Sequence, residues 1–162
     1  VEMALSAGHV LASHDDATLA HVSEAVEQGV RVAEFPTTIA AARASHQAGL
    51  KVLMGGPNIV RGGSHSGNIA ASDLAALGIL DVISSDYVPL SMLHAVFALT
   101  DGEAGITLPE AAAKATVNPA DAVGLTDRGR IIPGKRADLL RVRRHSDVPQ
   151  VREVWRSGRR VA

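Results

Sequence analysis

The sequence predicts an α/β fold with four parallel strands, followed by a small β appendage. Three observations predict it. Short runs of β-forming residues recur in the first half of the chain, alanine-rich stretches with helical periodicity separate them, and the composition changes near residue 129. Strands that alternate with helices form βα units around a parallel sheet. The expected strands are 9–13, 30–35, 51–56 and 80–85.

The first two intervening helices have recognisable start and stop signals. Short polar side chains precede each apolar-periodic stretch, and a glycine follows each one. Ser, Thr, Asp and Asn favour the N-cap of a helix, and glycine favours the position just past its end. The expected N-caps are Asp15 or Asp16 and Thr37 or Thr38, and the expected terminating glycines are Gly29 and Gly49.

The chain becomes predominantly helical after Tyr87. Thr107 and Glu110 have the spacing of a capping box, with Pro109 inside the first turn of the helix that they begin. A short helix is expected next, with Asn118 as its cap. These signals predict consecutive helices between the last strand of the sheet and the end of the first domain.

The tail has a different character. Residues 129–144 and 151–162 alternate short apolar runs with basic residues around turns at Pro133-Gly134 and Ser157-Gly158. Both segments are therefore expected to form short strands. The predicted domain division is 1–128 for the α/β unit and 129–162 for the β appendage.

The composition is that of a globular protein, with 162 residues and 46% hydrophobic content. Sixteen basic and seventeen acidic residues give a formal net charge of −1, so no global field favours nucleic acid or a membrane. Cysteine is absent, which excludes disulfides, thiolate metal sites and a cysteine nucleophile. A cytoplasmic protein that binds neither nucleic acid nor membrane is expected, while its oligomeric state, including a homo-oligomer, stays open.

Each expected strand ends near a polar side chain: His14, Glu34, Asn58 and Asp86, in chain order. Each has a structural alternative, because a histidine can begin a turn, a glutamate can be a solvated strand end and an aspartate can cap a helix. In parallel α/β folds, however, the loops that hold ligands converge at the carboxyl ends of the strands. Four such residues at one edge together indicate a functional site.

Histidine and carboxylates at adjoining strand ends indicate a divalent metal site. Imidazole and carboxylate oxygens are good ligands for zinc or manganese, and a metal with an open position acidifies bound water. The candidate ligands are His14, Glu34 and Asp86, and Asp86 is also the candidate group that accepts the proton of the attacking water.

The stretch GGPNIVRGGSHSGN, residues 55–68, is expected to be a loop that approaches an anion. Its glycines permit backbone conformations in which successive N–H groups face an anion, and Arg61 supplies a fork of donors. A flexible hinge is the structural alternative, but it does not account for the arginine or the histidine. The candidate substrate-binding residues are Asn58, Arg61, Ser64, His65, Ser66 and Asn68.

Four segments together resemble the carboxyl-terminal half of a diphosphatase family of phosphonate metabolism within the amidohydrolase superfamily: LASHDD, AEFPTT, MGGPNIVRGGSHSGN and LDVISSDYVP. The resemblance implies strands five to eight of a (β/α)8 TIM barrel and part of a flanking β domain. It matches His14 to a metal ligand after strand five and Asp86 to the strand-eight aspartate. Two features depart from the superfamily pattern: these residues contain neither the HxH pair of strand one nor the bridging group of strand four, and Glu34 stands where strand six usually ends in histidine.

That family hydrolyses α-D-ribose 1-methylphosphonate 5-triphosphate to the 5-phosphate and pyrophosphate. The resemblance therefore implies a metal-dependent hydrolase of a phosphoric anhydride, with a phosphorylated small molecule as its substrate. Two alternatives stay open. One is an amidohydrolase that acts on a cyclic amide or an amine, and the other is a catalytically incomplete fragment of a longer enzyme.

Overall fold

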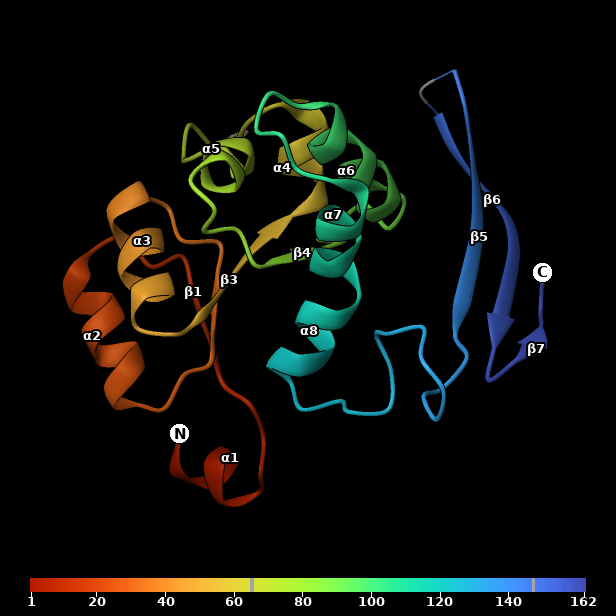
Figure 1. The fold of residues 1–162 in the computed structure, drawn as a ribbon. Coiled ribbons are helices and arrows are strands. Elements are labelled where there is room, and N and C mark those ends of the chain that lie inside the picture. Colours follow the sequence, from red (N-terminus) through yellow and green to blue (C-terminus); the bar gives the residue numbers. More distant parts are fainter. Residues whose placement is uncertain (65, 147) are drawn as a thin grey trace.

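A computed structural model describes residues 1–64, 66–146 and 148–162. Figure 1 shows a four-stranded parallel sheet among helices, and a separate three-stranded antiparallel sheet beside it. The parallel strands lie side by side in chain order, which agrees with the alternation in the sequence. They are β1 (Ala12–His14), β2 (Val32–Glu34), β3 (Lys51–Gly55) and β4 (Val82–Ser84).

Helices follow each strand of the parallel sheet. In Figure 1, α2 and α3 lie next to each other at the β1 end, and α6 and α7 lie at the β4 end. The helix bounds are α1 (Glu2–Ser6), α2 (Leu19–Glu27), α3 (Ile39–Gln47), α4 (Gly56–Arg61), α5 (Ala71–Ala76), α6 (Ser91–Asp101), α7 (Leu108–Ala115) and α8 (Val117–Ala122).

Threonine caps begin both α2 and α3. Thr18 accepts a hydrogen bond from the His21 N–H, and Thr38 accepts one from the Ala41 N–H. The expectation of Asp15 or Asp16 as the first cap is wrong, because Asp16 is buried and its carboxylate accepts the Ser13 hydroxyl instead. The terminating glycines Gly29 and Gly49 are confirmed by their positive φ angles of 76° and 86°.

The capping box of α7 is confirmed: Thr107 and Glu110 exchange hydrogen bonds between side chain and backbone. The predicted cap of α8 is wrong. Thr116 holds the N-cap position, and Asn118 lies inside the helix, where its side-chain N–H donates to the Asp81 carbonyl at 2.8 Å. The local pattern assigned the Asn118 side chain to the cap, but this side chain instead bonds to a residue far away in the sequence.

The second sheet contains β5 (Leu139–His145), β6 (Val148–Arg156) and β7 (Arg159–Arg160). Ser157 and Gly158 both have positive φ and form the predicted turn between β6 and β7. Of the strands expected around Pro133-Gly134, the one after the turn forms as β5, but the one before it does not, because residues 129–138 connect α8 to β5 without strand pairing. Their carbonyls instead accept hydrogen bonds within the connection and from the turn at Gly158.

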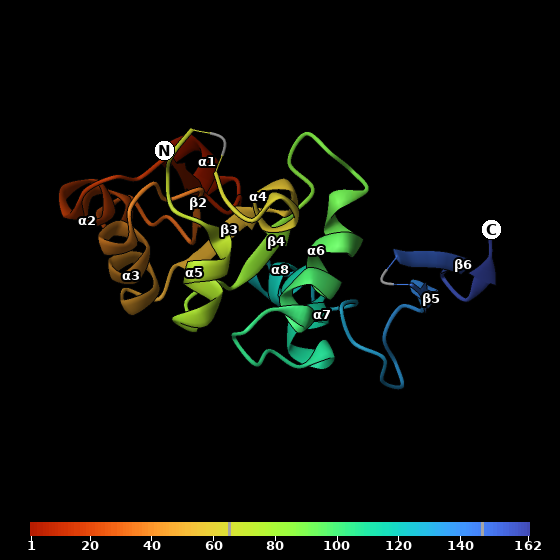
Figure 2. The same ribbon diagram turned by 90° about the horizontal axis from the view of Figure 1, so that it is seen from above.

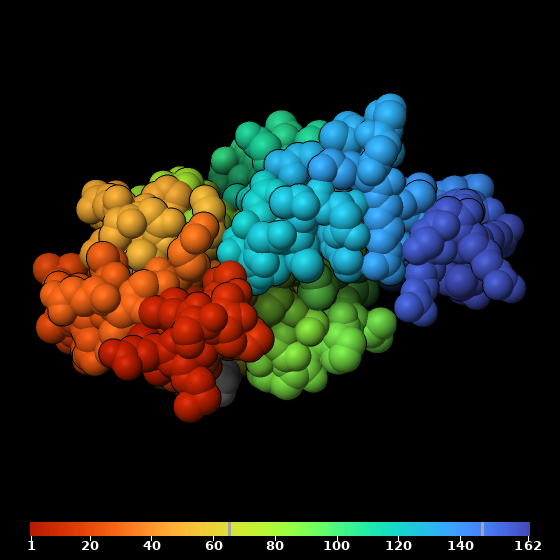
Figure 3. Space-filling model, turned by 90° about the horizontal axis from the view of Figure 1, so that it is seen from below, coloured from red at the N-terminus to blue at the C-terminus, as the bar shows by residue number. Residues whose placement is uncertain are grey.

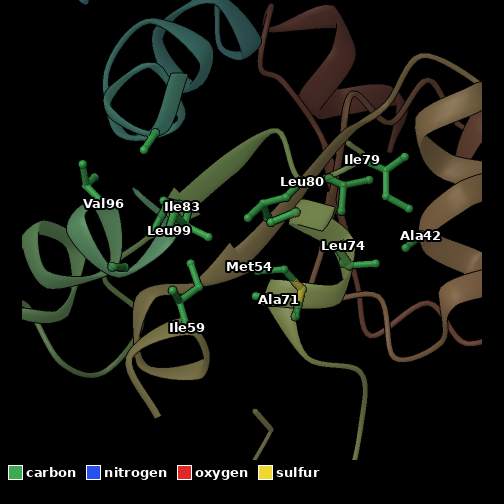
Figure 4. Close-up of a cluster of buried hydrophobic side chains, with 14 residues drawn as sticks. Ala42, Met54, Ile59, Ala71, Leu74, Ile79, Leu80, Ile83, Val96 and Leu99 are labelled. Atoms are coloured by element: carbon green, nitrogen blue, oxygen red, sulfur yellow. The ribbon is translucent and has the colours of Figure 1, made fainter. Parts of the chain in front are cut away.

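The main core lies between β3, β4 and the helices that follow them (Figure 4). Leu74, Leu80 and Ile83 are among the largest fully buried side chains, and they bring α5 and β4 into one cluster. Burying apolar area is the main favourable contribution to folding. The cluster fixes β3 and β4, which carry the site residues, in a rigid frame.

The second sheet contacts the first unit through α6. Arg144 makes a bidentate ion pair with Asp101 and lies over the Phe97 ring, with its guanidinium carbon 5.6 Å from the ring centroid. Hydrogen bonding to Arg144 lowers the pKa of the Asp101 carboxyl. Seen from above, this sheet extends away from the helices (Figure 2), and in Figure 3 the C-terminal strands, in blue, lie at one end of the surface, apart from the N-terminal residues, in red. Throughout the described residues, every helix falls short of the apolar length needed to cross a bilayer.

Candidate active site

A cleft of about 470 Å³ lies at the carboxyl ends of the four parallel strands. The ends of β1 and β4 and the segment after β3 all contribute to its lining. It therefore lies at the edge of the sheet where open α/β folds bind ligands. The polar lining residues are His14, Asp15, Asn58, Arg61, Ser64, Ser66, Asn68, Asp86 and Tyr87.

Of the five non-glycine residues with left-handed backbones in the described part of the chain, three follow strands of the parallel sheet, and the other two follow β5 and β6. The φ angles are 59° at Asp15, 54° at Phe35 and 48° at Asp86, and all three residues line the cleft. This conformation is costly for a residue with a Cβ, especially for a bulky one such as Phe35. Such strain persists only where surrounding contacts hold it, and its concentration at one cleft supports a functional site.

His14 ends β1 and has an exposed side chain. Its Nδ1 lies 3.1 Å from the Asp15 carboxylate, and its ring meets the Phe35 ring edge-on at 5.4 Å. Glu34 is the register partner of His14 on β2, but it is not among the residues that line the cleft. Of the three candidate ligands, the structure thus brings His14 and Asp86 to the cleft, and the role of Glu34 stays a prediction.

Asp86 occupies space that a side chain at Gly55 would need. A Cβ added to Gly55 would lie 2.9 Å from Asp86 Oδ2 and 3.1 Å from its Cβ. The turn that carries Asp86 is also held by Ser91, whose hydroxyl lies 2.6 Å from the Val88 carbonyl oxygen and 3.2 Å from that of Ser85. The end of β3 and the start of α6 therefore position the carboxylate together.

The stretch 55–68 is not a loop throughout, so that expectation is corrected. Gly56–Arg61 forms α4, with Pro57 in its first turn and Gly62 ending it at φ 81°. Proline suits the first turn of a helix because its missing N–H would have no intrahelical partner there. The described residues of the remainder, 62–64 and 66–68, have no regular structure, and Gly63, Ser64, Ser66 and Asn68 among them line the cleft.

Asn58 and Ser64 make hydrogen bonds within this segment. The Asn58 side chain accepts the Ala71 N–H at 2.8 Å and donates to the Ile69 carbonyl at 3.3 Å, while the Ser64 hydroxyl accepts the Ser66 N–H. Asn58 thus fixes the return of the segment to α5. Ser64, Ser66 and Asn68 line the cleft as well, and His65 lies outside the described residues.

The donor chemistry of the cleft fits a divalent metal in part. His14 and Asp86 supply one imidazole and one carboxylate, the ligand types that zinc and manganese accept. Within the described part of the chain, no group of three or more His, Asp or Glu side chains is placed to hold an ion. The residues present are therefore suited to supply some of the ligands of such a site.

Tyr87 is a cleft residue that sequence reasoning missed. Arg61 Nη2 donates to the Tyr87 hydroxyl at 2.9 Å, so the end of α4 is tied to the turn after β4. The available signal was its position directly after Asp86 in the segment SSDYVP.

A parallel sheet with a polar cleft at its carboxyl edge defines this chain as an α/β protein with a candidate ligand site, and the family follows from comparison. The model of the amidohydrolase family matches residues 8–162, so the chain belongs to that family. It is 57% identical over 152 residues to the α-D-ribose 1-methylphosphonate 5-triphosphate diphosphatase of Escherichia coli K12. That match covers 93% of this chain and 40% of the relative, so the chain spans well under half of the relative's length.

Two further proteins are similar. The imidazolonepropionase of Deinococcus deserti is 37% identical over 97 residues, which cover 54% of this chain and 24% of that protein. The crystal structure of an amidohydrolase superposes with a TM-score of 0.69 at 20% identity, covering 99% of this chain and 46% of the other. The structural likeness supports an amidohydrolase-like fold.

Proposed function

We propose that this chain is the carboxyl-terminal part of a metal-dependent diphosphatase that hydrolyses α-D-ribose 1-methylphosphonate 5-triphosphate to the 5-phosphate and pyrophosphate. The observation that carries the proposal is that His14, Asp86 and Arg61 line one cleft. The identity of 57% to the E. coli diphosphatase supports the substrate class.

The proposal includes the architecture. Residues 1–128 are the second half of a (β/α)8 barrel, strands five to eight, and residues 129–162 belong to a flanking β domain. The order of the four parallel strands supports this assignment, and so does the 40% share of the relative that the chain spans. The preceding part of the complete enzyme would cover the open edge of β1, because exposed edges of a sheet invite unwanted pairing.

The chain's own residues have distinct roles in the reaction. Water attacks the phosphorus atom nearest the ribose. The anhydride bond between this first phosphoryl group and the second one breaks, and pyrophosphate leaves. Asp86 accepts the proton of the attacking water, and Arg61 donates hydrogen bonds to the phosphoryl oxygens where negative charge increases. His14 and Asp86 would hold a divalent metal, zinc or manganese, which activates water and stabilises that charge.

The complete protein is therefore expected to release pyrophosphate from the ribose triphosphate and to lose this activity on treatment with a chelator. Zinc or manganese should restore it, because the metal is needed to activate water. Pyrophosphate production is followed with and without added metal. Absence of pyrophosphate release from the metal-loaded protein would refute the proposal.

A second candidate is hydrolysis of a cyclic amide, which the similarity to an imidazolonepropionase favours. In that case the cleft would hold a carboxylate instead of phosphate groups. Ring-opened product in place of pyrophosphate, measured in the same preparation, would select it.

Arg61→Ala is expected to lower kcat/KM by about 100-fold, in line with the loss of one donor to a developing oxyanion. KM should rise and kcat should fall, because phosphoryl charge changes between the ground state and the transition state. Arg61→Lys should keep part of the activity, since lysine restores the charge but not the bidentate geometry. Steady-state kinetics of pyrophosphate release measure these effects.

Arg43, an exposed residue of α3 outside the cleft lining, provides the matched control. Arg43→Ala should behave as wild type. Equal kcat/KM in Arg61→Ala and Arg43→Ala, with metal content intact, would contradict the phosphate-binding role of Arg61. It would favour the alternative that the segment after β3 is a flexible hinge.

A further inference from the structure

Arg61 and Tyr87 form a hydrogen-bonded pair in the lining of the cleft. Arg61 is the last residue of α4, Tyr87 follows Asp86 in the turn after β4, and both side chains line the cleft. The distance between Arg61 Nη2 and the Tyr87 hydroxyl oxygen is 2.9 Å. Both residues are exposed, so this bond is not required to satisfy buried polar groups.

The direction of this hydrogen bond leaves donors for a ligand. Arginine can only donate, so the Tyr87 oxygen is the acceptor, and the phenolic O–H stays available to donate elsewhere. The other guanidinium N–H groups of Arg61 are also donors. The pair therefore presents N–H and O–H donors of two kinds beside one another, an arrangement that suits the oxygens of a phosphoryl group.

Tyr87 also directly follows Asp86, the proposed proton acceptor, in the sequence. The left-handed backbone of Asp86 sets the direction in which the turn leaves the strand. A phosphoryl oxygen that accepts a hydrogen bond from Tyr87 is thus held in a fixed position relative to the turn that carries Asp86. Arg61 alone, at the end of a long exposed side chain, would give weaker orientation.

We propose that Tyr87 is a substrate-positioning residue: its oxygen holds the Arg61 guanidinium while its O–H donates to a phosphoryl oxygen of the substrate. The inference rests on the proposed function. It predicts that the phosphate-binding group of this enzyme is the Arg61–Tyr87 pair and that neither member acts fully without the other.

The test is Tyr87→Phe in the complete protein, alone and combined with Arg61→Ala. Loss of one hydrogen bond to a charged group predicts a rise in KM of about tenfold. The double variant should be little worse than Arg61→Ala, because residues that act through a shared bond are non-additive. A purely structural role would instead leave KM unchanged and lower the melting temperature.

Leu90→Ala is the control in the same connection between β4 and α6, because Leu90 is 78% exposed and lies outside the cleft lining. It should keep the wild-type KM. Equal KM in Tyr87→Phe and wild type would overturn the proposal, and so would an equal rise in Leu90→Ala, which would assign the effect to the turn.

Binding of inorganic tripolyphosphate, measured by calorimetry, separates this inference from the proposed reaction. If the wild type releases no pyrophosphate but binds tripolyphosphate about tenfold more tightly than Tyr87→Phe, the reaction is refuted and the role of Tyr87 stands. If the wild type is active and both proteins bind tripolyphosphate equally, Tyr87 has no positioning role.

Discussion

Gly55→Ala is expected to lower the kcat of the complete enzyme by about 100-fold, the loss that a misplacement of about 1 Å can cause. The added methyl group would lie 2.9 Å from Asp86 Oδ2 and 3.1 Å from Asp86 Cβ. Contacts this short do not persist, so the carboxylate and its turn must move away from the end of β3. The effect falls on the group that we propose accepts the proton.

The expected effect is on catalysis more than on folding. Gly55 does not need a positive φ, so alanine is compatible with its backbone. The neighbouring Gly56 differs, because a Cβ there would meet Ser91 Oγ at 2.6 Å and the Ser91 backbone at 3.0 Å. Gly56→Ala should therefore lower the melting temperature by forcing α4 from α6, whereas Gly55→Ala should lower kcat at a nearly unchanged melting temperature.

Gly102→Ala is the control for the methyl group itself. Gly102 ends α6 away from the cleft, and a Cβ there would approach no atom closer than 3.5 Å. Kinetics and thermal melting are measured for all three variants. If the kcat of Gly55→Ala is within twofold of the Gly102→Ala value, the position of Asp86 does not depend on the absence of a side chain at Gly55.

Local signals in the sequence predicted most of the elements correctly. The alternation of strands and helices, the glycines after α2 and α3, and the capping box of α7 all depend on residues close together in the chain. Hydrophobic periodicity and capping act over the same short range, so sequence reasoning can reach them. The strand ends then brought His14 and Asp86 to one cleft, as expected for a parallel sheet.

Several of the errors arose where distant residues decide the outcome. Gly55 and Gly56 suggested a loop that approaches an anion, but their neighbours in space are Asp86 and Ser91, which only the folded chain brings near. Asn118 had the composition of a cap but bonds to Asp81, 37 residues away. No local pattern contains these contacts, and the hydrogen bond of Arg61 to Tyr87 was inaccessible for the same reason.

Asp81 lies at the opposite edge of the sheet from the cleft, where it connects several elements. Its carboxylate accepts the Val52 N–H at 2.9 Å and lies 3.0 Å from His46 Nδ1, and its own N–H donates to the Val52 carbonyl at 2.9 Å. The side chain is only 14% exposed. This residue therefore holds the start of β4 against β3. These two strands lead to Asp86 and Gly55, respectively.

The same carboxylate affects a half-buried cation on α7. Burial lowers the pKa of Lys114 from its ordinary 10.5, and the charges of Asp81 and Glu110 partly oppose that shift. The unfolded chain thus binds this proton more tightly than the folded one. The Lys114 contribution to the free energy of unfolding is unfavourable at neutral pH and improves as pH rises through the lowered pKa toward 10.5. Loss of the Asp81 charge should extend this window to lower pH.

Asp81→Ala is therefore expected to reduce the free energy of unfolding by about 2–4 kcal/mol, because it removes charged hydrogen bonds and leaves the buried Val52 N–H without its acceptor. Asp81→Asn should cost less, since its amide oxygen can still accept from Val52. Asp73→Ala, at an exposed carboxylate of α5, should change stability by no more than about 0.5 kcal/mol. Chemical denaturation of the complete protein gives these values. Equal midpoints for Asp81→Ala and Asp73→Ala would contradict the role of Asp81 in holding β4 against β3. If Asp81 does hold the two strands together, Asp81→Ala should also lower kcat at temperatures below the melting transition, because the register of β3 and β4 sets the distance between Gly55 and Asp86.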